Sequence, residues 1–393
     1  MMARRTRFHT EVALRRTCGT MGTMILLNDF KRQWETVQEP VFQAVRRVGE
    51  SGWLILGTEV SVFEEALAPW FGKQEAVGMG NCMDATEHAL RALGILPGDH
   101  VLTTPFSAFA TTLAIVRAGG VPVFVDTDDS GQIDLDSVEN CLERCYHKIR
   151  AVLPVHLYGH PLNLDRLRKI QEHYSIPVIE DCAQAIGAKW MDESVGSCGR
   201  ISVTSFYPTK NLGAMGDGGA AMTDEPDLAI ALRSLRDYGQ AAKYSHELLG
   251  SNSRLDELQA AILNDAILPR LAEMTARRYE IASAYRHAIQ NSEIRVLRPE
   301  PDATPVDHLF PVFVPSARRD EFRQYLQSEG IQSAIHYPGL IPDQPAMRAC
   351  PFVISEDPRR ARELAATEVS LPLHPYLRDD EVARVIDFCN AWH

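Results

Sequence analysis

The chain has 393 residues, of which 45% are hydrophobic and 23% are charged, values typical of a folded globular protein and unlike those of disordered or collagen-like chains. Its net charge of −12 argues against a nucleic acid or an anionic membrane surface as the main partner. No apolar stretch reaches the length of a membrane span. The composition therefore indicates a soluble protein whose partners are small molecules or other proteins.

The eight cysteines are too sparse for a disulfide framework, which indicates a reducing, cytoplasmic environment. Cys141 and Cys145 lie four residues apart with His147 nearby, a spacing that fits either a metal pair or one helical face. Because no second ligand pair follows, we favour ordinary helix residues. Residues 1–23 are rich in arginine and lack the apolar core of a signal peptide, so we expect a disordered extension, with Met21 or Met24 as alternative starts.

From about residue 74, short apolar runs alternate with helical stretches, a pattern typical of a mostly parallel sheet covered by helices. We expect a large, doubly wound α/β domain over residues 24–252. The expected strands are Glu75–Met79, Val101–Thr104, Pro122–Asp126, Ala151–His156, Pro177–Asp181, Ser202–Phe206 and Ala220–Thr223. The expected helices between them are Ala85–Leu93, Phe109–Ala118, Asp136–Tyr146 and Leu164–Tyr174.

Beyond Asn252 the pattern predicts a connecting helix and a smaller α+β domain over residues 253–393. The helical run Arg254–Ile289 contains Pro269, which is expected to kink or split it. The small domain is expected to contain the strands His308–Val314 and Ser333–Tyr337 and the helices Arg318–Glu329 and Asp379–Ala391. An N-terminal helix over residues 29–49 and the loop Ser51–Gly57 are expected to pack on this domain.

Two polar sites follow predicted strands, where an open α/β sheet binds its ligands. The run Ile176–Asp181 ends in two acids and is followed by small residues that leave room for a planar group; a capping or ion-paired acid is the alternative. Lys210 lies in a glycine-rich loop, five residues after the strand-end Ser205. Partial burial there would lower the pKa of this lysine and suit it to a Schiff base with an aldehyde, whereas a solvated loop lysine is the alternative.

A third site, Val77–Ala85, reads as a strand, a glycine turn and a helix start, so its free backbone amides would bind a phosphate. It half-matches a dinucleotide fingerprint, but Met83 replaces the third glycine, and we favour a single phosphate over a nicotinamide cofactor. The three sites together fit pyridoxal 5′-phosphate, a phosphate-bearing aldehyde. Phe109 is the candidate ring that stacks on it, with a core position as the alternative.

Three segments carry a resemblance to a known family: Glu180–Ala188 (EDCAQAIGA), Ser205–Ala214 (SFYPTKNLGA) and Gly250–Ala261 (GSNSRLDELQAA). In order and spacing they resemble the DegT/StrS-type nucleotide-sugar aminotransferases, and the likeness runs from about Leu27 to the C-terminus. The resemblance implies fold type I of the pyridoxal-phosphate enzymes, like aspartate aminotransferase. It also implies a homodimer whose active sites lie at the subunit interface.

The resemblance also assigns roles by position. Lys210 would form the Schiff base, Asp181 would face the pyridine nitrogen and Gln184 would lie next to the ring hydroxyl. The phosphate would be held by one side chain, two backbone amides and one residue of the other subunit, which are Ser205, Cys82, Met83 and Asn252. Cys82 stands where the family has glycine, which puts the conformation of this turn in question.

A finer resemblance concerns the substrate. The segments Ser51–Gly57, Val155–Gly159 and Leu235–Gly239 are similar to the subgroup that acts on dTDP-linked 3-keto-6-deoxyhexoses. His336 and Tyr337 match a family segment near the sugar, and with Tyr207 they would contact substrate hydroxyls. Packing at the domain junction is the alternative for His336 and Tyr337.

The expected reaction is transamination from L-glutamate to a nucleotide-linked keto sugar, which gives an amino sugar for a secondary metabolite or a surface polysaccharide. Action on a 4-keto or UDP-linked sugar is one alternative. Relatives in which histidine replaces the lysine are dehydratases, and Lys210 argues against that reaction. The last alternative is a catalytically silent protein that keeps the fold for binding or regulation.

Overall fold

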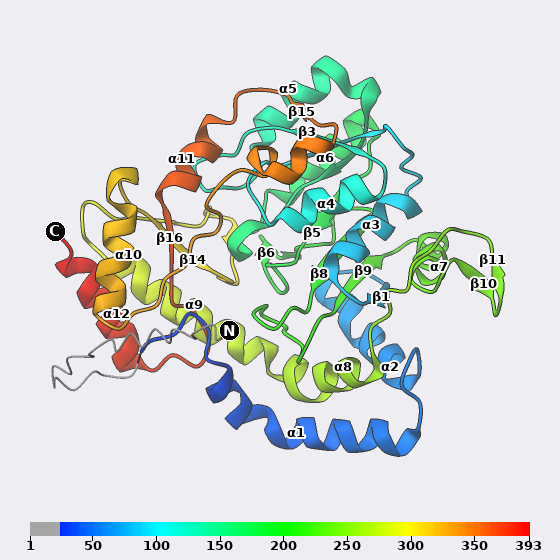
Figure 1. The fold of residues 1–393 in the computed structure, drawn as a ribbon, viewed down its shortest axis with the longest axis horizontal. Coiled ribbons are helices and arrows are strands. Elements are labelled where there is room, and N and C mark those ends of the chain that lie inside the picture. Colours follow the sequence, from blue (N-terminus) through cyan, green and yellow to red (C-terminus); the bar gives the residue numbers. More distant parts are fainter. Residues whose placement is uncertain (1–23) are drawn as a thin grey trace, which may run out of the picture.

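The computed structural model describes residues 24–393, so the expected extension of residues 1–23 lies outside it. A long central sheet dominates the larger part of the molecule (Figure 1). Its strands are β1 (Glu75–Met79), β2 (His100–Thr103), β3 (Val121–Phe124), β4 (Ile149–Leu153), β5 (Ile179–Asp181), β8 (Ile201–Ser205), β9 (Gly219–Thr223) and β15 (Val353–Ile354).

The sheet consists of two four-stranded pieces, β1-β9-β8-β5 and β15-β3-β2-β4. Parallel bridges from Val152 to Val178 and from Val155 to Asp181 join them, so β4 lies beside β5. All pairs are parallel except those of β9, which is antiparallel to both β1 and β8. The carboxyl ends of β5 and β8 therefore meet at one edge of the sheet.

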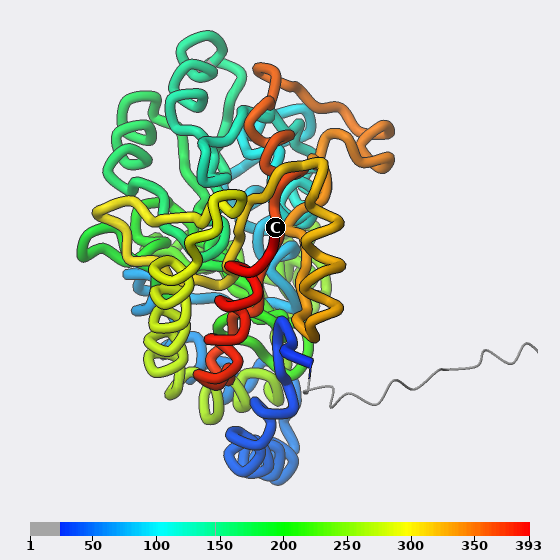
Figure 2. Tube along the Cα trace, turned by 90° about the vertical axis from the view of Figure 1, so that its left-hand side faces the viewer, coloured from blue at the N-terminus to red at the C-terminus, as the bar shows by residue number. Residues whose placement is uncertain are grey.

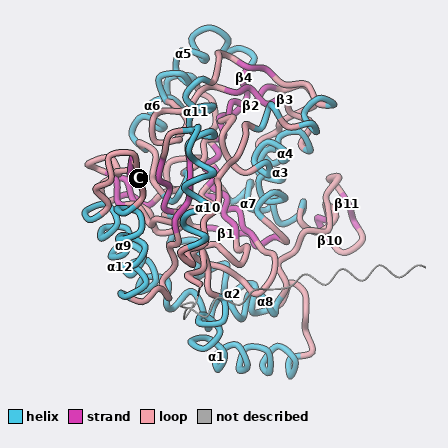
Figure 3. The backbone as a smooth tube through the Cα atoms, turned by 60° about the vertical axis from the view of Figure 1, so that its left-hand side comes forward, coloured by secondary structure: helices cyan, strands magenta, loops and turns pink. Residues whose placement is uncertain are grey.

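Helices cover both faces of the sheet, as a doubly wound fold requires (Figure 3). One face packs against α3 (Cys82–Ala92), α4 (Phe109–Arg117) and α7 (Pro226–Leu235), and the other packs mainly against α2 (Thr58–Leu67), α5 (Leu135–Cys145) and α6 (Leu164–Tyr174). Successive side chains of a strand point to opposite faces of the sheet, so each strand contacts both layers of helices. In β4, Ala151 and Leu153 contact the first layer and Val152 contacts the second. The predicted α/β architecture is confirmed.

The helical run after residue 252 is divided near Pro269, as its sequence predicts. It comprises α8 (Glu257–Ile262), the π-helical turn η4 (Leu263–Ile267), the 3₁₀ turn η5 (Leu268–Arg270) and α9 (Leu271–Ala288). Pro269 falls inside η5, where the missing N–H and the ring prevent a continuous α-helix. The run leads from the large sheet to the C-terminal part.

The C-terminal part contains a second sheet of order β12-β14-β16, with strands Arg295–Val296, Phe310–Phe313 and Glu368–Leu371. The helices α9, α10 (Arg319–Ser328) and α12 (Asp379–Ala391) pack on it, and α11 (Arg359–Thr367) leads into β16. The expected strand Ser333–Tyr337 is wrong: this segment forms only an isolated bridge from Ala334 to Ser370. Smaller pairs complete the list of strands: β6 (Lys189–Trp190), β7 (Glu193–Ser194), β10 (Gln240–Ala242), β11 (Ser245–His246) and β13 (Ala303–Thr304).

The N-terminal helix α1 (Phe30–Ser51) lies at one end of the molecule (Figure 2). Its buried face, from Val37 to Val48, packs on α8, η4 and the core of the large part, and not on the C-terminal sheet. The expected packing on the small domain is therefore limited to the first two turns, where Arg32 pairs with Glu381 of α12 at 2.6 Å and Thr36 contacts Tyr376. The apolar stripe of a helix predicts a buried face but not the surface that covers it.

The cysteines of the described residues form no disulfide. Cys141 and Cys145 face each other on α5 with their sulfur atoms 3.6 Å apart, as the single-face interpretation requires. No helix among residues 24–393 combines the length and the apolar character that crossing a bilayer requires.

The start of α2 depends on a side chain from α8. The cap residue Gly57 offers no side chain, so the buried carboxylate of Glu257 accepts hydrogen bonds from the backbone N–H groups of Gly57, Glu59 and Val60 at 2.8, 3.0 and 2.8 Å. This contact ties the loop at residues 51–57 to the connecting helices.

We expect Glu257→Ala to lower the free energy of unfolding by about 1–3 kcal/mol, because it leaves one buried and two partly buried N–H groups without this acceptor. Chemical denaturation at fixed protein and cofactor concentration measures the change. The matched control Glu35→Ala removes an exposed carboxylate from α1 and should change the stability by less than about 0.5 kcal/mol. Equal stability of the two variants would contradict the capping role.

Candidate active site

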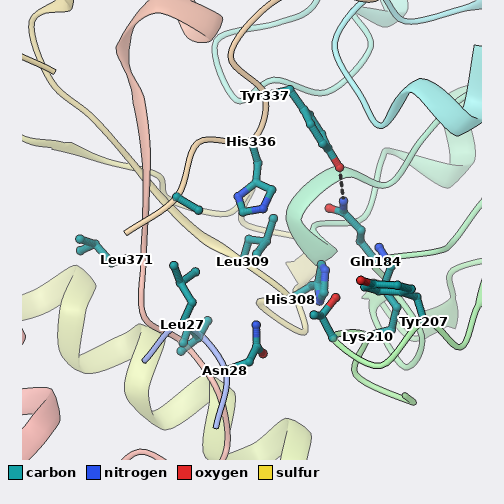
Figure 4. A pocket seen from close by; sticks show the side chains of 13 residues that line it. Leu27, Asn28, Gln184, Tyr207, Lys210, His308, Leu309, His336, Tyr337 and Leu371 are labelled. Carbon is teal, nitrogen blue, oxygen red and sulfur yellow. Dashed lines mark hydrogen bonds between the residues drawn. The ribbon is translucent and has the colours of Figure 1, made fainter. Parts of the chain in front are cut away.

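A cavity of about 340 Å³ lies between the edge of the large sheet and the C-terminal part (Figure 4). Five of the residues singled out from the sequence line it: Gln184, Tyr207, Lys210, His336 and Tyr337. The remaining lining residues are Leu27, Asn28, Thr209, His308, Leu309, Ala334, Leu371 and Leu373. Segments far apart in the sequence therefore supply one pocket with both polar and apolar walls.

Lys210 is positioned by the tight turn that follows β8. Its backbone N–H donates to the carbonyl of Tyr207 at 2.8 Å. Its side-chain amine lines the cavity, and the residues that the structure describes offer it neither a hydrogen bond nor an ion pair. Burial lowers the pKa of the amine, and the charge of Asp181 opposes this effect. An amine that is easily deprotonated and otherwise unengaged is available for covalent chemistry.

The two acids that end β5 have different environments. Glu180 accepts hydrogen bonds from His156 and from the backbone amides of Gly196 and Gly199, so it is a structural acid on one face of the strand. Asp181 faces the other way and accepts hydrogen bonds from Thr111 Oγ1 and from the amide of Ala183, both at 3.0 Å.

Asp181 is 5% exposed. Burial raises the pKa of its carboxyl group, while the two hydrogen bonds and the charge of Lys210 oppose the rise. The carboxylate and the Lys210 amine thus lie close enough for each to favour the charged form of the other. This is the arrangement expected for an acid and an amine that serve one bound group.

The start of α3 lies beside the end of β8. Ser205 pairs with Gly219 of β9, and a Cβ atom at Gly219 would come within 2.4 Å of the backbone nitrogen of Cys82, so glycine is required there. Asn81 caps the amide of Asp84 at 2.8 Å, and among residues 24–393 no capping side chain engages the first two amides of the helix, those of Cys82 and Met83. Two free amides, the helix dipole and a serine hydroxyl make this corner suitable for a phosphate.

Cys82 does not distort this turn. The non-glycine residues with positive φ in the described chain are Leu56, Tyr158, Ser175, Met191, Tyr238, Tyr244 and Asp307, and Cys82 is not among them. A side chain is therefore tolerated at the position where the family has glycine. Burial raises the pKa of the Cys82 thiol, which keeps the thiol uncharged.

Gln184 joins the two sides of the cavity. Its side-chain oxygen accepts from the amide of Tyr158 at 2.6 Å, and its nitrogen donates to the hydroxyl of Tyr337 at 3.2 Å (Figure 4). Burial raises the pKa of Tyr337, so its phenol is neutral. Tyr207, by contrast, is 52% exposed at the mouth of the cavity.

Two histidines line the cavity on the side of the C-terminal part. Burial and the nearby Lys210 charge lower the pKa of His336 to about 4, and the same causes hold the pKa of His308 well below its usual value. The Nδ1 atom of His308 lies 3.1 Å from the side-chain oxygen of Asn211, the residue after Lys210. The cavity thus presents neutral groups that hydrogen bond, apart from the lysine.

Six predicted residues do not line the cavity: Cys82, Met83, Phe109, Asp181, Ser205 and Asn252. Four of them, Asp181, Ser205, Cys82 and Met83, lie at the ends of β5 and β8 and at the start of α3. Phe109 begins α4, is partly buried and packs beside Phe124, Ile341 and Met347. Asn252 is exposed, and its backbone forms an isolated bridge with Asp237 near the β10–β11 hairpin. Neither observation tests the role that the resemblance gives these residues.

Sequence reasoning missed Thr111, His308 and Asn28. Thr111 lies inside a predicted helix and has no signal apart from its place after Phe109. His308 begins a predicted strand, and Asn28 precedes the cap residue of the first helix. Their contribution depends on how the C-terminal part and the N-terminal segment pack against the sheet, which local patterns do not contain.

The sequence and the fold of this chain are similar to those of known sugar aminotransferases. A curated relative, dTDP-3-amino-3,4,6-trideoxy-α-D-glucose transaminase from Streptomyces venezuelae, is 39% identical over 93% of this chain and 95% of its own. A UDP-N-acetyl-3-dehydro-α-D-glucosamine 3-aminotransferase from Acidithiobacillus ferrooxidans is 36% identical over 93% of this chain and 97% of its own. The crystal structure of DesV from Streptomyces venezuelae superposes with a TM-score of 0.89 at 38% identity, covering 94% of this chain and 99% of DesV.

The fold is that of the fold type I pyridoxal-phosphate enzymes. A family model for the DegT/DnrJ/EryC1/StrS aminotransferases matches residues 35–389, which include both sides of the cavity. The chain therefore belongs to the DegT/DnrJ/EryC1/StrS aminotransferase family and is an aminotransferase that depends on pyridoxal phosphate.

Proposed function

We propose that this enzyme transfers the amino group of L-glutamate to carbon 3 of a nucleotide-linked keto sugar, with a dTDP-linked 3-keto-6-deoxyhexose as the leading candidate. The observation that carries the proposal is the unengaged Lys210 amine in a cavity lined by neutral hydrogen-bonding groups. The names of the two relatives above place the amino or keto group at carbon 3, one on a dTDP sugar and the other on a UDP sugar. They support the ketone position more strongly than the nucleotide.

The residues present fit pyridoxal phosphate. A free amine, a buried carboxylate and a corner suited to a phosphate lie at one edge of the sheet, and these are the groups that an aldehyde, a ring nitrogen and a phosphate would require. When bound, the cofactor supplies an aldehyde that takes up the amino group and a ring that withdraws electrons. We assign its binding to Lys210, Asp181, Gln184, Ser205, the amides of Cys82 and Met83, Phe109 at the ring face, and Asn252 of the partner subunit.

Lys210 holds and moves the protons of the reaction. Its Nζ atom removes the proton from the α-carbon of glutamate and later returns a proton to carbon 3 of the sugar. Burial suits it to this role, because a lowered pKa leaves a larger fraction of the amine neutral at a given pH. Asp181, held by Thr111 and the Ala183 amide, supplies the negative charge that keeps the ring nitrogen protonated.

Tyr207, His336 and Tyr337 bind the hydroxyl groups of the sugar in this proposal. His336 and Tyr337 are neutral, so each forms hydrogen bonds without the cost of burying a charge. Tyr207 lies at the exposed mouth, where the nucleotide end of the substrate would leave the cavity.

We also propose a cytoplasmic homodimer. Large apolar side chains are exposed near Asn252, including Tyr244 at 82% and Leu249 at 87%, and a symmetric partner would cover them. The unpaired cysteines of the described residues support a reducing compartment.

The lowered pKa of Lys210 predicts the pH dependence of cofactor binding. The rate at which the cofactor-free protein recovers its visible absorption band with pyridoxal phosphate should rise with pH. The midpoint of this rise should lie below 10.5, the ordinary pKa of lysine, because burial favours the neutral amine. Lys210→Ala should give no band, whereas Lys169→Ala, which removes an exposed lysine of α6, should behave as the wild type. A midpoint equal to that of a free lysine derivative would contradict the assignment.

The shared site predicts complementation. Lys210→Ala and Asn252→Ala protomers should each be impaired alone, but a randomised mixture should recover about one quarter of the wild-type activity, because about half of the dimers are mixed and each mixed dimer has one intact site. Refolded mixtures assayed for 2-oxoglutarate formation measure this. Failure to recover activity in mixed dimers would place Asn252 in the site of its own subunit.

The relatives predict the substrate preference. With L-glutamate, kcat/KM should be at least about tenfold higher for dTDP-3-keto-6-deoxyhexose than for the 4-keto isomer or for a UDP-linked 3-keto sugar, since misplaced hydroxyls leave polar groups of the cavity unpaired. Lys210→Ala should lower turnover by more than about 10³-fold. A preference for the 4-keto isomer would contradict the assignment of the reaction to carbon 3. A preference for the UDP sugar would contradict the assignment of dTDP as the nucleotide.

A further inference from the structure

Behind one wall of the cavity, a chain of hydrogen bonds leads from His336 to a buried acid. The Nδ1 atom of His336 lies 2.8 Å from Ser370 Oγ, and Ser370 Oγ lies 2.5 Å from Glu368 Oε1. The other carboxyl oxygen, Oε2, accepts from the backbone N–H of His336 at 2.6 Å. Glu368 and Ser370 are both fully buried in β16.

Backbone contacts hold Ser370 and His336 of this hydrogen-bond chain in place. Ser370 and Ala334 exchange two backbone hydrogen bonds, at 2.9 and 3.2 Å, and Tyr158 Oη donates to the carbonyl of His336 at 2.7 Å. Glu368 and Ser370 are two residues apart on one strand, so both side chains project from the same face toward His336. The three groups therefore have little freedom to form other contacts.

The ring of His336 points into the cavity, toward His308 and Lys210 (Figure 4). Because burial and the Lys210 charge lower its pKa to about 4, the ring is neutral and carries one N–H. The Nε2 atom forms no hydrogen bond with the residues that the structure describes. Which nitrogen carries the proton thus decides whether His336 offers a donor or an acceptor to a ligand.

The hydroxyl of Ser370 has a single proton, and this links the two ends of the chain. With Glu368 ionised, Ser370 donates to Oε1 and accepts from Nδ1–H, so Nε2 is an acceptor. With Glu368 protonated, Oε2 is still occupied by the His336 amide, so the acid proton lies on Oε1 and donates to Ser370. Ser370 then donates to Nδ1, and Nε2 carries the proton.

We propose that Glu368, acting through Ser370, is the positioning residue that sets whether His336 donates or accepts a hydrogen bond at the sugar. The inference rests on the proposed function, because it takes the ligand of His336 to be a nucleotide-linked keto sugar. A donor at Nε2 suits a ketone or hydroxyl oxygen of that sugar, whereas an acceptor suits only a hydroxyl proton.

The surroundings indicate which form prevails. Burial raises the pKa of Glu368 to about 8, opposed by Ser370, by the His336 amide and by the charges of Arg319 and Arg323 on α10. Tyr158 and Tyr337 face the acid as neutral phenols, since burial raises the pKa of both. Glu368 is therefore mainly protonated at neutral pH, which makes His336 a donor, and it ionises at alkaline pH, which makes His336 an acceptor.

The test uses the full-length protein loaded with pyridoxal phosphate and ¹⁵N-labelled at histidine. Long-range ¹H–¹⁵N spectra distinguish the two neutral tautomers, and His336→Gln identifies the signal. In the wild type, the proton should lie on Nε2 at neutral pH and move to Nδ1 as the pH rises through about 8. Glu368→Gln should hold it on Nε2 throughout, because the side-chain amide of this variant donates to Ser370 at every pH.

Two further variants make the test specific. Ser370→Ala should remove the pH response of the tautomer and lower kcat/KM about three- to tenfold, with a larger effect on the sugar half-reaction than on the glutamate half-reaction. Glu363→Gln, which neutralises an exposed acid of α11, should keep the wild-type response. A tautomer that responds to pH in the same way in wild type and Glu368→Gln would overturn the proposal.

The spectra are recorded without sugar, so they test the chain independently of the substrate. The tautomer of His336 could depend on Glu368 in a protein that aminates no nucleotide-linked keto sugar. This result would overturn the proposed function and, with it, the role assigned to His336 at the sugar. If the protein aminates the sugar but the tautomer of His336 does not depend on Glu368, only the positioning role of Glu368 would be overturned.

Discussion

The site depends on the burial of an amine and a carboxylate at the same edge of one sheet. Burial favours the uncharged form of each, and each charge in turn favours the charged form of the other. The pair exists because β5 ends at Asp181 and the parallel neighbour β8 leads directly into the turn that carries Lys210. A shift of one residue in either strand would turn one of the two side chains to the opposite face.

The remainder of the site is arranged around this pair. The close approach of Gly219 brings the start of α3 beside Ser205, which puts a corner suited to a phosphate on one side. The C-terminal sheet and its loops supply His308, His336 and Tyr337 on the other side. Neither half of the chain forms the cavity alone.

Much of the fold follows from local patterns. The strand Glu75–Met79 and the helices Leu164–Tyr174 and Asp379–Ala391 have the predicted bounds, because apolar periodicity and end signals agree there. The expected strand Ser333–Tyr337 fails because its β-prone residues meet a neighbouring strand only at Ala334. The helix at residues 29–49 was expected, but the surface that covers its buried face is a tertiary property.

The same limit applies to the site. Lys210, Asp181 and Ser205 could be predicted because they follow strands at the carboxyl edge of the sheet, where position alone suggests function. Glu368 and Ser370 could not, because the strand Glu368–Leu371 resembles any short alternating segment and their meaning comes from contact with His336. Resemblance to a family supplied the roles, and the structure supplies the distances and charge environments.

The function proposed for this enzyme is to take an amino group from L-glutamate and deliver it to a 3-keto nucleotide sugar, with Lys210 moving the protons. Absorbance spectroscopy of the purified holoenzyme, with the two substrates added in sequence, tests this function. L-Glutamate should abolish the visible band of the lysine-bound cofactor, and dTDP-3-keto-6-deoxyhexose should restore it. A band that glutamate leaves unchanged, or that only a different class of acceptor restores, would contradict this function.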